Sequence, residues 1–454
     1  MFTLNQRKIS NRVSSAMLYH EAGRVLRSKG LVFEANLPGA GIGSICRVFP
    51  DPRNLDIADS ALAEVIGFQE KSILIMPFEE VRGINSESLV VLEQKASVQP
   101  VSRALLGRVI DAMGNPIDGK GPIDWSLPDR EERSLYQIAP NPVERKVIDR
   151  PIGVGVRAID GLLTLGRGQR IGIMAGSGVG KSVLLGMISR FTTADVNVIA
   201  LVGERGREVR EFIERELGPE GLKRSVVIVA TSDRSALQRV RAAHLASTIA
   251  EFFRDAGKDV LLLMDSVTRF AMALREIGLS LGEPPSSKGY TPSVFAALPK
   301  LLERAGMGTQ RGSVTGIYTV LVEGDDMDEP VADATRSILD GHIVLTRALA
   351  HQNHFPAIDV LSSASRVMNS VISKEHLNSA SKVKDWLAVY RKSEDLINIG
   401  AYVRGANSKI DEAVAVIDRI NAFLKQPSQE RSNIDESKAL LNLIERSAEA
   451  SSAG

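Results

Sequence analysis

The stretch Ala175-Gly-Ser-Gly-Val-Gly-Lys-Ser182 decides how this chain folds. It follows the apolar run Arg170-Ile-Gly-Ile-Met174, and a helical pattern covers residues 183–191 after it. A strand, a glycine-rich loop, a lysine, a hydroxyl and a helix in this order predict a phosphate-binding loop. The glycines let backbone N–H groups point inward, and the helix N-terminus behind them attracts anions. A glycine-rich turn without a ligand is the alternative, and it does not explain why these features occur together.

The loop supplies the predicted nucleotide-binding residues. They are Gly176, Ser177, Gly178, Val179, Gly180, Lys181, Ser182 and Val183. Lys181 places a point charge on the β and γ phosphates, and the Ser182 hydroxyl can ligate Mg²⁺. Ala175 stands where the strict motif has glycine, so the match is slightly relaxed.

A magnesium site also needs an acid at a strand end. The apolar run Val260-Leu-Leu-Leu-Met264 is followed directly by Asp265. A buried strand that delivers one carboxylate at its C-terminal end suits this role. The alternative is that Asp265, or Ser266 after it, caps a helix. We predict that Ser182 and Asp265 ligate the metal.

Hydrolysis needs a group that orients and polarises water. The apolar run Val196–Val202 ends in Gly203-Glu-Arg-Gly-Arg-Glu208. We predict that Glu204 lies beside the P-loop strand and faces the same crevice at the carboxyl ends of the sheet. A carboxylate near the γ-phosphate can accept the proton of the water or hold it in line. Arg205 is predicted as a second cation there, and a solvated charge run at a helix start is the alternative for both residues.

Composition limits the class of protein. A chain of 454 residues exceeds one ordinary core, so two or three domains are expected. With 24% charged and 44% hydrophobic residues it reads as soluble and globular, and no apolar run approaches the roughly 20 residues that span a bilayer. A net charge of +1 gives no basic surplus for nucleic acid. The single cysteine, Cys46, excludes an internal disulfide framework.

Three zones of the sequence differ in their pattern of apolar and turn-forming residues. From residue 21 to 98, short apolar runs are broken by glycine, proline and aspartate, which predicts a small β-barrel or sandwich. From 100 to 373, continuous apolar strands alternate with helical stretches, which predicts a parallel sheet covered on both faces. From residue 375 the pattern is helical only. At the N-terminus, Ile9, Val13 and Met17 have helical spacing, and both a frayed helix and a docking helix for a partner or an anionic membrane remain open.

Longer segments resemble a known family. Leu106-Gly-Arg-Val-Ile-Asp111, Pro151-Ile-Gly-Val-Gly-Val-Arg157 and Gly203-Glu-Arg-Gly-Arg-Glu208 are similar to the catalytic subunits of rotary ATPases. The form of the P-loop resembles the protein-export ATPases of flagella and type III secretion. So do residues 288–295, 319–326 and 338–345. Residues 393–405 look more flagellar than virulence-type, whereas residues 362–368 are shared by both branches.

The resemblance implies an α/β fold with a RecA-like P-loop ATPase core, an N-terminal β-barrel and a C-terminal helical domain. It also implies assembly as a homo-hexameric ring. On this basis we predict a docking helix at 1–24, the barrel at 25–98, the ATPase domain at 99–373 and the helical domain at 374–454.

The resemblance also implies roles for single residues. Glu204 matches the catalytic glutamate and Asp265 the aspartate of the magnesium site. Arg366, in Ala364-Ser-Arg-Val, resembles the arginine finger that is offered to the adjacent subunit. Phe355 matches the aromatic residue that stacks on adenine, where relatives often have tyrosine; phenylalanine keeps the stacking face. An ordinary core aromatic is the alternative for Phe355.

The implied function is hydrolysis of Mg-ATP that powers or prepares protein export through the flagellar type III secretion apparatus. The implied location is cytoplasmic, peripheral at the export apparatus of the inner membrane. Implied partners are an export regulator at the N-terminal helix, a coiled-coil stalk protein, the export gate and chaperone–substrate complexes. Loops 282–286 and 324–328 are candidates for the central surface of the ring, and solvated turns are the alternative. No nucleic-acid partner is predicted.

Three other functions stay open at this stage: the ATPase of a virulence (injectisome) system, a non-catalytic ring subunit, and an RNA-driven hexameric helicase. The presence of Lys181, Glu204 and Asp265 together argues against the second. The balanced net charge argues against the third.

Overall fold

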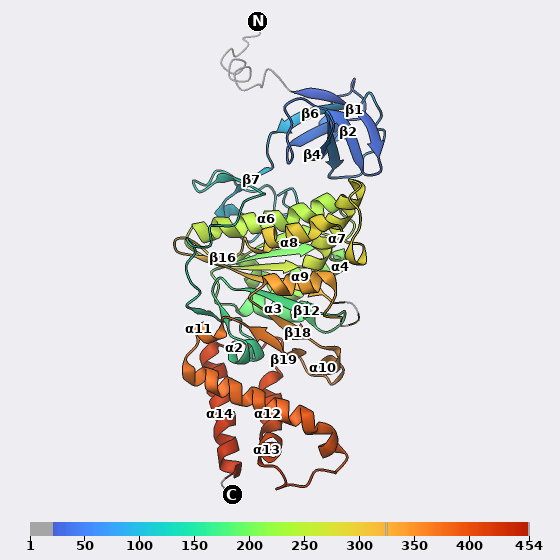
Figure 1. Ribbon diagram of the computed structural model, residues 1–454. Coiled ribbons are helices and arrows are strands. Elements are labelled where there is room, and N and C mark those ends of the chain that lie inside the picture. Colours follow the sequence, from blue (N-terminus) through green and yellow to red (C-terminus); the bar gives the residue numbers. More distant parts are fainter. Residues whose placement is uncertain (1–20, 323, 325, 453–454) are drawn as a thin grey trace. The chain divides into compact units, whose positions relative to one another are not determined.

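The computed structural model describes residues 21–322, 324 and 326–452, with side chains up to residue 448. The chain divides into two compact units, Met1–Val98 with Leu279–Glu283 and Gln99–Gly278 with Pro284–Gly454 (Figure 1). Among the described helices, none is both long and apolar enough to cross a membrane.

The first unit contains a closed antiparallel β-barrel. Its strands follow the order β1-β2-β5-β4-β3-β6. Their bounds are β1 (Ala22–Lys29), β2 (Val32–Asn36), β3 (Ile45–Phe49), β4 (Ala61–Gln69), β5 (Ser72–Pro77) and β6 (Leu89–Gln94). Alternate residues such as Val25, Ala35, Val48 and Val65 point into one apolar core. The closed strand order identifies a barrel, where the sequence left a sandwich open.

The start of this barrel corrects one predicted boundary. Strand β1 begins at Ala22, and Ala22 pairs with Val91 while Arg24 pairs with Asn36. Residues 22–24 therefore belong to the barrel and not to a docking helix at 1–24. The ladder to two neighbouring strands, with Val25 buried between them, fixes these residues as strand. Residues 1–20, the rest of that prediction, lie outside the described residues.

The second unit is built on one large sheet. Its strands follow the order β19-β18-β12-β17-β15-β13-β14-β8, with β16 paired to β17. Their bounds are β8 (Val109–Asp111), β12 (Arg170–Ala175), β13 (Val196–Val202), β14 (Ser225–Ala230), β15 (Asp259–Asp265), β16 (Gly306–Met307), β17 (Ser313–Leu321), β18 (Gly341–Leu345) and β19 (Ile358–Ser365). The predicted parallel sheet is confirmed for the central strands. Strands β19 and β16 pair antiparallel, which the sequence did not reveal.

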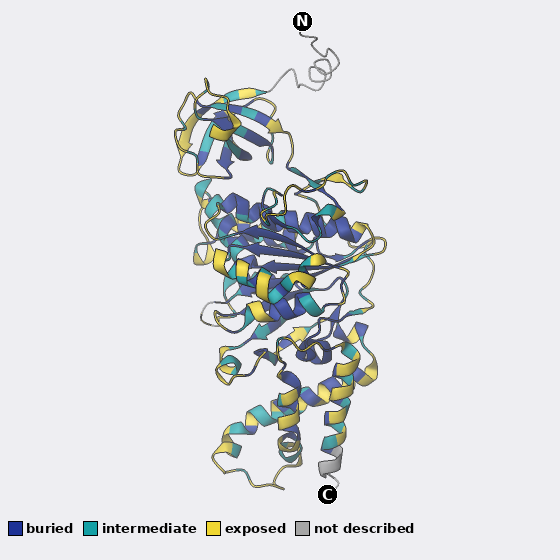
Figure 2. Cartoon of the chain, turned by 180° about the vertical axis from the view of Figure 1, so that it is seen from behind, coloured by how far each residue is buried: buried dark blue, intermediate teal, exposed yellow. Residues whose placement is uncertain are grey.

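Helices cover both faces of this sheet. Ile173 and Leu201 belong to one apolar core, whereas Val198 and Val202 belong to another, because successive strand residues point to opposite faces. Figure 2 shows these strands buried almost throughout. The helices are α2 (Arg157–Leu162), α3 (Lys181–Phe191), α4 (Gly206–Glu211), α5 (Gly218–Lys223), α6 (Ala236–Asp255), α7 (Val267–Ser280), α8 (Pro292–Leu302), α9 (Pro330–Ile338), α10 (Arg347–His351) and α11 (Met368–Val371). Short strands complete the unit: β7 (Val98–Val101) with β9 (Glu131–Ser134), and β10 (Pro151–Ile152) with β11 (Leu165–Gly166).

Three further helices follow, as the sequence predicts: α12 (Lys374–Asn398), α13 (Ser408–Leu424) and α14 (Ile434–Ser452) (Figure 1). Their buried residues, including Val383, Ile420 and Leu441, belong to the same apolar core as Ile159 of α2. The C-terminal helices and the ATPase core therefore form one compact unit, and a domain boundary at 373/374 stays a prediction.

Candidate active site

The P-loop runs from the end of β12 to the start of α3. Gly178 and Gly180 have φ values of +80° and +85°, which L side chains rarely adopt. A Cβ atom on Gly180 would also lie 3.4 Å from the ring of Phe355. Val179 differs from its neighbours, because its side chain is only 1% exposed and packs in the core. Only its backbone can face a ligand.

The loop borders a polar cavity of about 670 Å³. The cavity is lined by Ser177, Lys181 and Ser182 from the loop side and by Glu204, Arg205 and Glu208 from the segment after β13. Strand β13 is not a direct neighbour of β12, because β17 and β15 lie between them. Glu204 nevertheless reaches the loop, since the C-terminal ends of all these parallel strands meet at one edge of the sheet.

Lys181 contacts both predicted acidic residues, Asp265 and Glu204. Its ammonium lies 2.5 Å from Oδ1 of Asp265 and 3.4 Å from Oε1 of Glu204. All three side chains are nearly buried, with 12%, 6% and 13% exposure for Lys181, Asp265 and Glu204. Thr319 on β17 donates to the same Asp265 oxygen at 2.6 Å and fixes its orientation. Asp265 thus lies just behind the cavity wall, where it contacts the lysine.

Burial and charge perturb these groups. Burial raises the pKa of Glu204 to about 7, the charge of Asp265 adds to the rise, and Lys181 opposes it. Glu208, on α4, also raises the pKa of Glu204 through a hydrogen bond between the two side chains. Burial alone would lower the pKa of Lys181, but the two carboxylates raise it. A carboxyl group that titrates near neutrality is suited to accept a proton.

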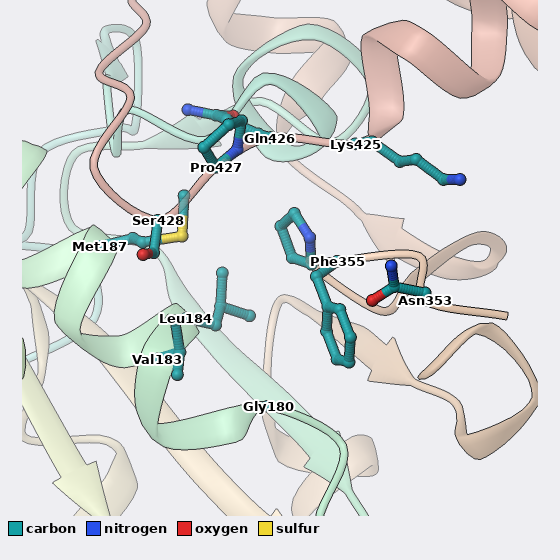
Figure 3. Close-up of a pocket in the computed structure, with 11 residues that line it drawn as sticks. Gly180, Val183, Leu184, Met187, Asn353, Phe355, Lys425, Gln426, Pro427 and Ser428 are labelled. Atoms are coloured by element: carbon teal, nitrogen blue, oxygen red, sulfur yellow. The ribbon is translucent and has the colours of Figure 1, made fainter. Parts of the chain in front are cut away.

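A second cavity adjoins the first. Its volume is about 570 Å³, and it shares Gly180 and Val183 with the polar cavity. Figure 3 shows the residues that line it: Gly180, Val183, Leu184, Met187, Asn353, Phe355, Pro356, Lys425, Gln426, Pro427 and Ser428. The ring of Phe355 lies over Gly180 and is 42% exposed, so it is not an ordinary core aromatic. A polar cavity beside an apolar one matches the two halves of a nucleotide.

The two arginines predicted for the site, Arg205 and Arg366, lie in different places. Arg205 lines the polar cavity but is 80% exposed and paired with Glu208. Arg366 follows β19, at the level of Arg170, where β12 begins. Five residues of strand separate that level from the end of β12, which is roughly 16 Å at 3.3 Å per residue. Arg366 is exposed and cannot reach the P-loop of its own chain.

Sequence reasoning missed several residues of the site. Arg269 lines the polar cavity, its stem packs against Gly203, and its Nε is buried without a hydrogen-bond partner among the described residues. It lies in the first turn of α7, the helix that follows Asp265, and no motif in the sequence singled it out. Thr319 was overlooked although it stands in a segment quoted for the resemblance, and Glu208 was assigned to the solvated charge run at the helix start. The wall formed by residues 425–428 had no local signal.

Comparisons with known proteins agree with this geometry. Residues 155–365 match the nucleotide-binding domain of the ATP synthase alpha/beta family, and residues 372–442 match the T3SS EscN ATPase C-terminal domain. The flagellum-specific ATP synthase of Bacillus subtilis is 54% identical over 94% of this chain and 95% of its own length. The type 3 secretion system ATPase of Sinorhizobium fredii is 50% identical over 91% and 90%.

Solved structures agree as well. The assembled ATPase EscN from the enteropathogenic E. coli type III secretion system has a TM-score of 0.86 at 48% identity, over 93% of this chain and 99% of that one. EscN has also been solved in complex with its central stalk EscO, with a TM-score of 0.85.

Fold and site together define an ATP-hydrolysing P-loop enzyme of the ATP synthase alpha/beta class. Within that class, the chain belongs to the family of flagellum-specific ATP synthases and type III secretion ATPases.

Proposed function

We propose that this protein hydrolyses Mg-ATP at the P-loop and that hydrolysis powers or prepares protein export through the flagellar type III secretion apparatus. The observation that carries the proposal is the contact of Lys181 with both Glu204 and Asp265 beside a cavity that continues into an apolar pocket. In this arrangement the triphosphate lies along the loop, and the base lies against Phe355.

The loop would hold the phosphates through its backbone N–H groups and through Lys181. Ser182, which lines the cavity, and Asp265, which Thr319 orients, would hold Mg²⁺, and the metal would supply positive charge against the phosphates. Two protein ligands with phosphate oxygens and water suit Mg²⁺, which rarely has an all-protein cage. Arg269 and Arg205 add positive charge at the γ-phosphate end of the cavity.

Glu204 acts on water. Its carboxylate accepts a proton from the water that attacks the γ-phosphorus, the bond between that phosphorus and the bridging oxygen breaks, and ADP leaves with the electron pair. The charge that develops on the γ-phosphate oxygens needs a further cation. Arg366 of the adjacent subunit is proposed for this role, because it is exposed and too far from its own P-loop.

The roles of Asp265 and Mg²⁺ can be tested together. Asp265→Asn removes a charged ligand while keeping the side-chain size, so we expect the Mg²⁺ concentration for half-maximal ATP hydrolysis to rise at least about tenfold. Asp259→Asn, at the other end of β15, is the matched control and should leave the Mg²⁺ dependence unchanged. Phosphate release measured across a Mg²⁺ titration decides the matter, and an unchanged midpoint in Asp265→Asn would exclude Asp265 as a ligand.

The proton-accepting role of Glu204 predicts a pH dependence. Because the pKa of this carboxyl is raised to about 7, kcat/KM should fall as the pH falls through that value and Glu204 becomes protonated. Glu208→Gln removes a neighbour that raises the pKa, so its midpoint should move to lower pH. Titration of ATP itself is the same for both proteins, so the difference between the profiles isolates the protein group. Superimposable profiles would contradict the assignment.

The flagellar system is proposed over the virulence system. Flagellum-specific relatives from Bacillus subtilis and Treponema pallidum are 54% and 49% identical, and residues 393–405 have a flagellar pattern. A hexameric ring, a cytoplasmic place at the export apparatus, and a stalk protein entering the ring are proposed by analogy with the assembled EscN and its complex with EscO.

Binding of a regulator by residues 1–20, and of the export gate and chaperone–substrate complexes, is proposed from the family alone. Among the candidate stalk-facing loops, Lys288 next to loop 282–286 donates to Asp326 of loop 324–328 at 2.9 Å, and Asp325 lies outside the described residues.

A further inference from the structure

One wall of the apolar pocket comes from the segment between α13 and α14, far along the chain from the P-loop. Lys425, Gln426, Pro427 and Ser428 form this wall, opposite Gly180 and Val183 in Figure 3. The segment has no regular hydrogen-bond ladder of its own, so its position depends on bonds from elsewhere. Those bonds come from α2, from α3 and from the segment of Phe355.

Arg157, at the start of α2, holds the wall from behind. Its guanidinium donates to the carbonyl of Phe423 at 3.0 Å and to that of Lys425 at 2.5 Å, and it forms an ion pair with Glu430. The two carbonyls stand at the C-terminal end of α13, where the helix dipole favours a cation. Arg157 is 8% exposed, and each of its three guanidinium nitrogens has a partner in this contact.

Both the oxygen and the nitrogen of the Gln426 side chain form hydrogen bonds within the protein. Its oxygen accepts from the backbone N–H of Arg157 at 2.8 Å, and its nitrogen donates to the carbonyls of Gly155 and Glu430 at 2.9 and 2.8 Å. Its backbone N–H donates to the carbonyl of Phe355 at 2.9 Å. The side chain is buried at 3% exposure and points away from the Phe355 ring in Figure 3. Gln426 therefore cannot read a base directly, although it belongs to the pocket.

The P-loop helix contacts the same wall. Arg190, in the last turn of α3, donates to the carbonyl of Ser428 at 2.7 Å. Gln426 thus joins the wall to the segment of Phe355, Arg157 joins it to α2, and Arg190 joins it to α3. These bonds fix one side of the apolar pocket, and Leu184 and Met187 of α3 line another part of it.

We propose that Arg157 and Gln426 are positioning residues for the nucleotide base: they hold the wall 425–428 in place across the pocket from Phe355 before ATP binds. The proposal rests on the function proposed above. Preorganisation raises affinity because the cost of ordering the wall is met during folding and not during binding. Since neither residue lies near the phosphates, the effect should concern the base half of the ligand alone.

The test compares ATP with tripolyphosphate, which has the phosphates but no base. Gln426→Met keeps the side-chain shape but removes its hydrogen bonds, and Arg157→Lys keeps the charge but cannot donate to the same set of acceptors. In each variant we expect the KM for ATP to rise about tenfold, corresponding to one or two lost hydrogen bonds. The kcat should change less than about twofold, and the inhibition constant of tripolyphosphate should stay the same, because chemistry and phosphate binding are untouched.

The matched control is Arg224→Lys. Arg224 also donates to carbonyls at the C-terminal end of a helix, those of Ser189 and Arg190 in the last turn of α3 and those of Thr192 and Ala194 just after it, but it does not line the apolar pocket. It should lower the melting temperature as Arg157→Lys does while leaving the KM for ATP unchanged. An unchanged KM for ATP in both Gln426→Met and Arg157→Lys would overturn the proposal. An equal loss of inhibition by tripolyphosphate would overturn it as well. If Gln426→Met does not fold, Arg157→Lys alone decides. A wild-type protein that does not turn over ATP would instead refute the proposed function.

Discussion

Glu204→Gln is expected to lower the kcat of ATP hydrolysis by about two to four orders of magnitude. The amide keeps the size of the side chain and an oxygen for Lys181, which lies 3.4 Å from Oε1. It cannot accept a proton at neutral pH, so the attacking water loses its base. Nucleotide binding should stay within a few-fold of the wild type, because the phosphates contact the loop and not this carboxylate. Phosphate release at saturating Mg-ATP, with ADP affinity measured in parallel, separates the two effects.

Glu208→Gln provides the matched control for this substitution. Glu208 lines the same cavity and contacts Glu204, but it is 38% exposed and paired with the solvated Arg205. Its kcat at high pH should stay near the wild-type value. Wild-type turnover in Glu204→Gln would remove the proposed base, and absence of turnover in the wild type itself would favour the non-catalytic ring subunit.

Arg366→Ala is expected to lower hydrolysis about a thousandfold or more if the arginine completes the site of an adjacent subunit. The side chain makes one hydrogen bond among the described residues, to the carbonyl of Leu339 at 3.2 Å, and is otherwise exposed. In the wild type, specific activity should rise with protein concentration as rings form, and Arg366→Ala should abolish that rise. Activity that is independent of concentration, under conditions where ring formation is observed, would contradict a role in trans.

Mixing two inactive variants makes the same test sharper. Lys181→Ala destroys the P-loop half of the site and Arg366→Ala destroys the finger half. If the halves come from different subunits, a ring of head-to-tail interfaces assembled from equal amounts has about one interface in four with both halves intact. Activity should therefore reappear on mixing. If Arg366 acted on its own chain, every subunit would remain defective and mixing would restore nothing.

The sequence predicted most reliably what is local and buried. The P-loop needs only a strand, a turn and a helix in succession, and the inner strands β12, β13 and β15 are continuous apolar runs because helices cover both their faces. Asp265 and Glu204 could be found because they follow such runs at the catalytic edge of the sheet. Phe355 and Arg366 lie in edge or loop segments without such a pattern and were found by resemblance.

The order of the strands in the sheet and the contacts between distant segments could not be predicted from the sequence. Nothing in the run of β13 shows that β15 and β17 separate it from β12, so the order of the strands could not be predicted. Strand β19 was missed because it lies at the edge of the sheet and alternates buried and exposed residues. The wall 425–428 was missed because it lies more than two hundred residues from the P-loop in the sequence and is held by Gln426 and Arg157, whose partners only folding brings together.

Because the wall 425–428 comes from the C-terminal helical segment, the nucleotide pocket cannot be kept intact in a fragment without that segment. A fragment that ends at residue 373 would contain the whole sheet and every side chain placed at the phosphates, yet it would lack one side of the base pocket. The same fragment would also lose the buried residues of α12, α13 and α14 that share an apolar core with α2, so the base pocket and the stability of this core depend on the same helices. The C-terminal helices are therefore expected to contribute to nucleotide binding as well as to the shared apolar core.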